Sequence, residues 1–354
     1  MCSGLQCLHR QCLNSNTRAK HHAAVDLAEI GIRMLLDELL RLVPPDTKDR
    51  VDNTRDRANL IVRESLRNET GLRLRRPDAE EVVNVRVRLV EGLPRTLVQR
   101  QIEEKHRVAA LIAPWRHTLE TLQRSGAETL KLYAILAADR SANALVRDSA
   151  ASLEMVLDSA NKLLEQTHGF SLTQWILNVH EDVLGIYTYR LPEHYQATFG
   201  VPRPRRIGDP HIELYWAVIG LIARSMNVAV EDLTVVVVAH ELAHAFTHAG
   251  FDIDGETWNC YDFADSMIEV KEGLAQYYAW RVCERAQSTF PGARDAFEVL
   301  LKHQPPPYHA HEPWVKENTP EQVRWAMLRS RRVGRVDVER FRHMLEEART
   351  LLGE

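Results

Sequence analysis

The stretch VVVVAHELAHAFTHAG, residues 235–250, decides the fold, because it has to be assigned either to a strand or to a helix. Its four consecutive valines favour a strand locally. The apolar residues in and around it nevertheless recur at helical spacing, and Gly250 is a natural place for a helix to end. The side of this helix that is predicted to be buried consists of Leu233, Val236, Val237, Leu242 and Phe246. We therefore predict one helix that carries the pentapeptide HELAH.

This pentapeptide places two histidines and a glutamate close together. On a helix, His240 and His244 lie on one face about a turn apart, so both imidazoles can reach the same ion. Glu241 lies one residue round and can take a proton from a water molecule beside that ion. Two neutral nitrogen ligands, an open position and a carboxylate base are what a zinc hydrolase requires. The pentapeptide alone also fits two hydrogen-bonded histidines on a half-buried helix, so a third ligand has to be found.

Three residues are candidates for the third ligand: His248, Glu269 and Glu272. His248 is about 12 Å from His240 along a helix that rises ~1.5 Å per residue, too far for three histidines to grip one ion. The segment DSMIEVKEGLAQYYAWRVCERA, residues 265–286, predicts a second helix that presents Glu269 and Glu272 on one face, a turn apart. On spacing alone, either glutamate could complete the site.

Together, HELAH and the following EGLAQYYA resemble the motifs of the gluzincin metallopeptidases of the thermolysin-like zincin clan. These enzymes place the third zinc ligand, a glutamate, in an EG-x-A-x-Y type context. The resemblance covers residues 183–285 and implies that His240, His244 and Glu272 hold one catalytic Zn²⁺, with Glu241 as the general base. It also implies that FDIDGETWNCYDFA, between the two helices, forms a loop.

The same resemblance implies two further parts of an active site. The first is an edge strand ahead of the motif helix, for which VLGIYTYR (183–190) and IELYW (212–216) are the candidates. The second is a His or Tyr that stabilises the oxyanion. The proline-rich segment KHQPPPYHAHEPW offers Tyr308, His309 and His311, of which we take His311 as the catalytic candidate. The choice among the three stays open, since the segment also reads as a polar surface loop.

The chain organisation is predicted from shifts in its pattern. Residues 1–22 are expected to be a disordered leader, and residues 23–167 a mainly helical accessory domain with a β-hairpin near 72–90. The helical pattern is expected to break near Ser125–Gly126. Residues 168–354 are expected to form the zincin-like metallopeptidase domain. The fold class is therefore α+β and predominantly helical, with a small antiparallel sheet beside the active-site helix.

Composition restricts the partners and the compartment. A formal net charge of −4 gives no general basic surface, so no nucleic acid partner is expected. No apolar run reaches the length of a membrane span, and the N-terminus lacks the apolar core of a signal peptide. The 5 cysteines are odd in number and poorly placed for a disulfide framework, which fits a reducing compartment. We expect a cytoplasmic protein without membrane association, and the sequence leaves its oligomeric state open.

The function expected from these features is that of a zinc-dependent metallopeptidase acting on a peptide or protein substrate. One alternative is a non-catalytic helical interaction protein with a structural metal site. The intact Glu241 argues against it, since a structural site has no use for a base. The other alternative is a zinc hydrolase of a non-peptide bond, which the same residues would serve.

Overall fold

The computed structural model of the chain is described here for residues 36–37, 39–74, 83–94, 97, 115–138, 144–166, 172–177, 183–190, 208–251 and 263–353. The chain divides into two compact units, each made of two segments. Unit 1 consists of Met1–Leu42 and Arg95–Ile176, and unit 2 of Val43–Pro94 and Leu177–Glu354. The predicted leader, residues 1–22, lies outside the described residues, as does most of the predicted loop FDIDGETWNCYDFA.

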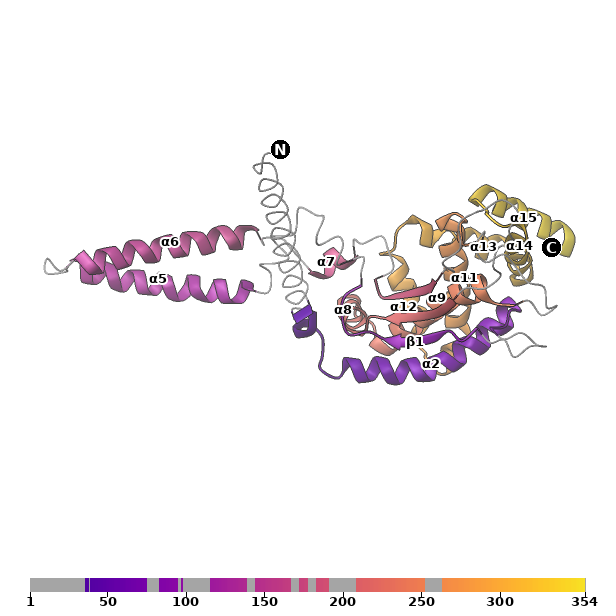
Figure 1. Cartoon of the computed structure of the whole chain (residues 1–354), viewed down its shortest axis with the longest axis horizontal. Coiled ribbons are helices and arrows are strands. Elements are labelled where there is room, and N and C mark those ends of the chain that lie inside the picture. Colours follow the sequence, from indigo (N-terminus) through magenta and orange to yellow (C-terminus); the bar gives the residue numbers. More distant parts are fainter. Residues whose placement is uncertain are drawn as a thin grey trace, which may run out of the picture. The chain divides into compact units, whose positions relative to one another are not determined.

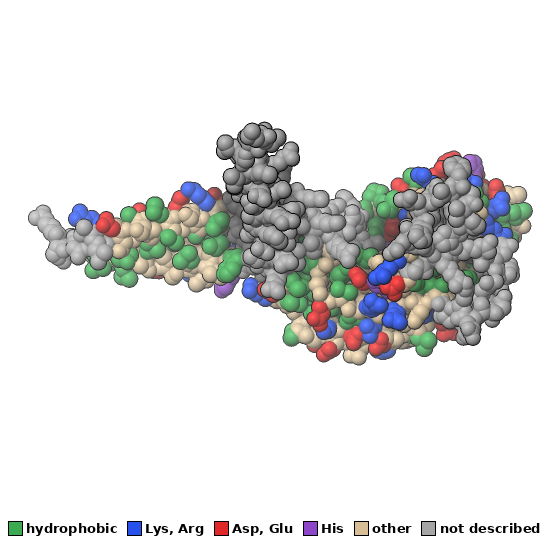
Figure 2. Space-filling model, viewed as in Figure 1, with side chains coloured by type: hydrophobic (Ala, Val, Ile, Leu, Met, Phe, Trp, Pro, Cys, Tyr) green, Lys and Arg blue, Asp and Glu red, His purple; other side chains and the backbone are tan. Residues whose placement is uncertain are grey.

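The described part of unit 1 is dominated by a helical hairpin. Helices α5 (Arg116–Ala138) and α6 (Ala144–Gln166) lie side by side (Figure 1), and the short helix α7 spans Leu172–Leu177. The predicted break near Ser125–Gly126 is wrong, because α5 runs through it. A Cβ atom on Gly126 would lie 2.5 Å from Leu157 Cδ2, so the glycine allows α6 to approach closely. Hydrophobic side chains remain at the surface of both helices (Figure 2), among them Leu132, Ile135, Leu136, Met155 and Val156.

Unit 2 is built mainly from helices, and α9 forms its centre. These helices are α2 (Thr47–Thr70), α8 (Trp216–Met226), α9 (Val230–Ala249), α11 (Ile268–Arg285), η2 (Ala286–Ser288), α12 (Ala293–Leu301), η3 (Pro306–His309), α13 (Glu312–Glu317), α14 (Pro320–Val333) and α15 (Val338–Leu352). The sequence around VVVVAHELAHAFTHAG is thus one helix, as predicted. It is buried on all sides rather than on one, because α2, α8, α11, α12 and the sheet all pack against it.

Helix α2 belongs to the same unit as α9, although about eighty residues of unit 1, Arg95–Ile176, lie between them in the sequence. Figure 1 shows α2 running along the outside of the unit, and its apolar face, with Val51 and Val62, is fully buried. Its far end is fixed by Glu69, which is 3 % exposed and pairs with Arg281 and Arg285 of α11. The predicted boundary at residue 168 therefore has to be corrected. The helical pattern of α2 identified its secondary structure but not its packing partner.

A three-stranded sheet lies beside α9 and has the order β1–β3–β2. Strand β1 is Arg86–Leu89, β2 is Gly185–Arg190 and β3 is Gly208–Leu214. The predicted antiparallel sheet is wrong in part, because β3 pairs antiparallel with β2 but parallel with β1. The sheet is therefore mixed.

The predicted hairpin near 72–90 lies partly outside the described residues, which do not include 75–82. One hydrogen bond joins the Val83 amide to the Leu74 carbonyl at 2.8 Å. Arg73 pairs with Phe251, and β1 pairs with β3. The alternation of apolar residues predicted the strand β1 correctly. It did not predict the partner strand β3, which lies far along the chain. No described helix is both long and apolar enough to cross a membrane.

Candidate metal centre

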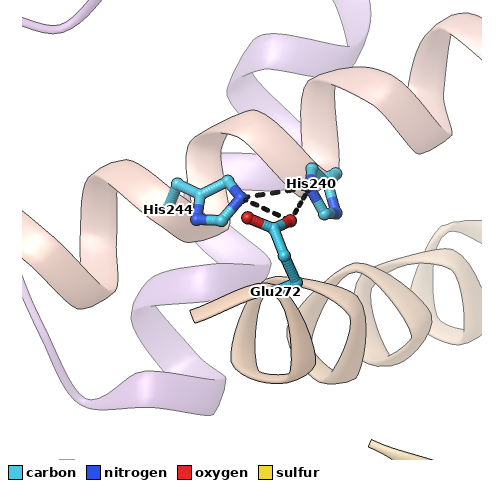
Figure 3. Close-up of side chains that lie close together, drawn as sticks. All are labelled: His240, His244 and Glu272. Carbon is cyan, nitrogen blue, oxygen red and sulfur yellow. Dashed lines mark hydrogen bonds and ion pairs between the residues drawn. The ribbon is translucent and has the colours of Figure 1, made fainter. Parts of the chain in front are cut away.

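Three side chains from two helices converge at the centre of unit 2. His240 and His244 come from α9 and Glu272 comes from the second turn of α11 (Figure 3). The Nε2 atoms of the two histidines are 3.1 Å apart, and each is 3.2 Å from Glu272 Oε2. Among the described residues, no other group of three His, Cys, Asp or Glu side chains meets in this way. Glu269, the alternative third ligand, lies outside the group.

The spacing of these donor atoms fits a small metal ion. In a tetrahedral zinc site with bonds of about 2.0–2.1 Å, the donor atoms lie about 3.3–3.4 Å apart. The observed separations of 3.1 and 3.2 Å are close to that value. Two imidazole nitrogens and one carboxylate oxygen also form the donor set of one class of catalytic zinc site. The cluster can therefore hold a metal ion without rearrangement of its helices.

Burial makes the cluster electrostatically coupled. Burial by itself would lower the pKa of His244, but the adjacent Glu272 carboxylate outweighs burial and raises that pKa above its ordinary value. Burial would likewise raise the pKa of Glu272, but His244 and His240 hold it well below its usual range. In the metal-free protein the two histidines thus form buried ion pairs with Glu272. A metal cation that binds between the three side chains can take the place of these ion pairs.

Glu241 is held beside the cluster by the close approach of a strand. The residue is 2 % exposed and lies on α9 next to His240. A Cβ atom on Gly185 of β2 would lie 2.9 Å from Glu241 Cγ and 2.8 Å from Val237 Cγ1. Only a glycine lets the strand pass so near to α9. Gly185 therefore fixes the space in which the Glu241 side chain lies.

A second glycine explains the EG pair of the sequence motif. A Cβ atom on Gly273, directly after Glu272, would lie 2.5 Å from Trp314 Cη2 and 3.1 Å from Ala310 Cβ. The Trp314 indole, buried against Phe341 at a ring separation of 4.6 Å, thus packs directly on the backbone of α11. This contact locks the turn of α11 that carries the third ligand.

A cavity of about 170 Å³ adjoins the cluster. Strand β2, helix α9 and the start of α11 supply its walls. The residues that line it are Ile186, Tyr187, Tyr189, Glu241, His244, Thr247, His248, Phe263, Ala264, Lys271 and Glu272. The expected base and two of the three ligands therefore face the same space.

The three candidates for oxyanion stabilisation are not among the residues that line this cavity. Tyr308 is buried and stacks on the His240 ring, at a centroid distance of 5.7 Å. His309 Nδ1 lies 2.6 Å from Glu312 Oε1, within hydrogen-bond distance. His311 is 3 % exposed, with Nδ1 2.8 Å from the Tyr308 carbonyl oxygen, and burial lowers its pKa. Tyr308 thus packs against the cluster through His240, whereas His311 contacts Tyr308 and Phe297 and is not among the residues that line the cavity.

Sequence reasoning missed the residues that shape the cavity. Tyr187 and Tyr189 lie two residues apart on one face of β2. The pattern predicted a strand, but it did not predict that these tyrosines line a cavity. Lys271 precedes the ligand directly, yet a single lysine in a helix carries no recognisable pattern. Adjacency to Glu272 was the one available signal for Lys271.

The chain matches no protein-family model, and comparisons with curated proteins and with solved structures give no significant match. The resemblance to gluzincins therefore rests on the two sequence motifs alone.

Proposed function

We propose that the chain is a zinc-dependent metallopeptidase that hydrolyses peptide bonds in a peptide or protein substrate. The observation that supports this most is the convergence of His240, His244 and Glu272, with Glu241 on the wall of the adjoining cavity. A purely structural zinc site takes four protein ligands and has no use for a cavity with a carboxylate facing it, whereas three protein ligands are what a catalytic site uses.

The proposed chemistry assigns one role to each polar group. His240, His244 and Glu272 would hold zinc, which supplies a Lewis acid that activates water and polarises a carbonyl group. Glu241 accepts a proton from the attacking water and donates it to the leaving amine. The close packing of Gly185 against its side chain restricts its rotamers and keeps the carboxylate near the reacting atoms.

The sheet favours a peptide over other hydrolysable substrates. Strand β2 is at the edge of the sheet, and three of its residues, Ile186, Tyr187 and Tyr189, line the cavity. Within the described residues, no strand pairs with the outer edge of β2. An extended peptide can add to that edge through backbone hydrogen bonds, which would carry a peptide bond past Glu241.

The test is substitution of the base with the ligands kept intact. Glu241→Gln preserves shape, so the protein should fold and retain zinc, while hydrolysis of a pool of unstructured peptides falls by at least ~10²–10⁴-fold. Glu231→Gln is the matched control, because Glu231 is on the same helix but pairs with Arg50 at 2.7 Å, away from the cavity. Unchanged turnover in zinc-loaded Glu241→Gln protein would refute the proposal.

A further inference from the structure

The cavity beside the metal cluster contains a cation that the proposed mechanism does not use. The three ligands and Glu241 all have roles, but Lys271 also lines the cavity and has none. Its Nζ donates a hydrogen bond of 2.8 Å to the Ala264 carbonyl oxygen. An ammonium group has three donors, so two of them can serve a ligand.

The charge balance of the cavity leaves Lys271 uncompensated. A divalent ion held by two neutral imidazoles and one carboxylate carries one net positive charge, which Glu241 balances. Among the described residues that line the cavity, Lys271 then carries a positive charge that no carboxylate balances. Among the described residues, no carboxylate lies within ion-pair distance of Lys271 Nζ, whose one hydrogen-bond partner there is Ala264.

The remaining walls strengthen the effect of this charge. The rings of Tyr189 and His248 are 4.5 Å apart, and those of Tyr187 and His248 are 5.8 Å apart. Together with buried Phe263, they surround the cavity with aromatic surface. Charge pairing in such surroundings is less screened than at an open surface. At about 170 Å³, the cavity is smaller than the ~300–1,000 Å³ of drug-sized sites, so it suits one side chain or one chain terminus.

We propose that this cavity selects a carboxylate of the substrate, and that Lys271 determines this specificity. The proposal rests on the proposed peptidase function and adds a substrate class to it. The carboxylate comes either from an Asp or Glu side chain near the scissile bond or from the C-terminus of a peptide. Both present the same group to Lys271, and matched peptides can tell them apart.

Binding is measured first, in zinc-loaded Glu241→Gln protein, because binding there needs no turnover. The probes are unstructured peptide pools with Glu or Gln at internal positions, each made with a free C-terminus or a C-terminal amide. Peptides with the selected carboxylate should bind about tenfold more tightly than their uncharged counterparts, as expected for a partly buried charged hydrogen bond. Preference for Glu over Gln identifies a side chain, and preference for acid over amide identifies a terminus. Equal affinity for all pools overturns the proposal.

Substitution then assigns the preference to Lys271. In the Glu241→Gln background, the zinc site keeps an unbalanced positive charge, so Lys271→Met should keep zinc and reduce the preference, whereas Lys271→Arg should retain most of it. Lys302→Met is the matched control, because it removes the same charge from an exposed position outside the cavity. A preference that Lys271→Met leaves undiminished would show that the carboxylate is recognised elsewhere, which also overturns the proposal.

Cleavage by the zinc-loaded protein with Glu241 intact separates this proposal from the function on which it rests. Cleavage at the same rate and at the same positions in all pools refutes the role of Lys271 and supports the peptidase function. Preferential binding without any cleavage refutes the peptidase and leaves the carboxylate pocket standing. Cleavage at a fixed offset from Glu, or near a free but not an amidated C-terminus, supports both.

Discussion

Gly185→Ala tests whether the approach of β2 to α9 positions the proposed base. An alanine in place of a strand glycine is ordinarily stabilising by about 0.5–1 kcal/mol, because it restricts the unfolded chain. Here the added Cβ would lie 2.8 Å from Val237 Cγ1, 2.9 Å from Glu241 Cγ and 3.1 Å from Glu241 Oε1. Overpacking of this kind costs about 1–3 kcal/mol. The net effect should be a loss of about 1–2 kcal/mol.

In Gly185→Ala protein, turnover should fall much more than the thermal stability does. The lower free energy of unfolding should reduce Tm by about 2–8 °C in a unit of this size. Turnover should fall by about 10²-fold, since displacement of a catalytic group by about 1 Å is enough for such a loss. Zinc content should stay the same, because the three atoms nearest to the added Cβ belong to Val237 and Glu241 and not to a ligand.

Gly220→Ala is the control for stability alone. Its Cβ would lie 2.6 Å from Thr47 Cγ2, a comparable clash between α8 and α2. Gly220 does not line the cavity, so this variant should lose stability while its folded fraction keeps normal turnover. Normal turnover in folded, zinc-loaded Gly185→Ala protein would refute the positioning role of this glycine.

Three other perturbations follow from the site and from the packing of unit 2. Glu272→Ala should lose the bound zinc, whereas Glu269→Ala should retain it, as metal analysis of the purified proteins would show. The raised pKa of His244 means that its pair with Glu272 stabilises metal-free protein fully below about pH 6.5, as long as Glu272 is ionised, and progressively less as pH rises through that pKa. Zinc binding requires the neutral imidazole, so the rise in Tm on adding zinc should be larger at about pH 8 than at about pH 6. A fragment of residues 169–354 should fail to fold and to hold zinc, while co-expression with residues 43–94 should restore both, because α2 covers α9.

Each of these predictions has a contradicting result. Equal zinc content in the two glutamate variants would exclude Glu272 from the site. A zinc-induced change in Tm that is independent of pH would contradict the proton–metal competition at His244. A folded, zinc-binding fragment of residues 169–354 would show that α2 is dispensable.

The local parts of the site could be predicted from sequence, and the long-range parts could not. His240 and His244 are four residues apart on one helix, so their convergence follows from helical geometry alone. The nomination of Glu272 needed the resemblance, because spacing did not distinguish it from Glu269. The group of three formed by His240, His244 and Glu272 in the structure contains the nominated residue.

The errors arose where the partner lies far along the chain. Strand β1 pairs in parallel with β3, more than a hundred residues later, and α2 packs on α9 although the segment Arg95–Ile176 of unit 1 lies between them in the sequence. An apolar face shows that a segment is buried, but it does not show against what. The wrong prediction of a helix break at Gly126 also arose from an unseen packing partner. The glycine lies within α5 and makes room for Leu157 of α6.

The interleaving of the two units has a consequence for synthesis on the ribosome. Between the end of α2 at Thr70 and the end of α9 at Ala249, 179 residues (249 − 70) have to be added. At ~5–20 residues per second this takes about 10–40 s. During that time the side of α2 that carries Val51, Val62 and Leu66 has no α9 to cover it, and it is open to chaperones and to other nascent chains. A ribosome that stalls within Arg95–Ile176 would therefore display an amphipathic helix whose main packing partner has not yet been made.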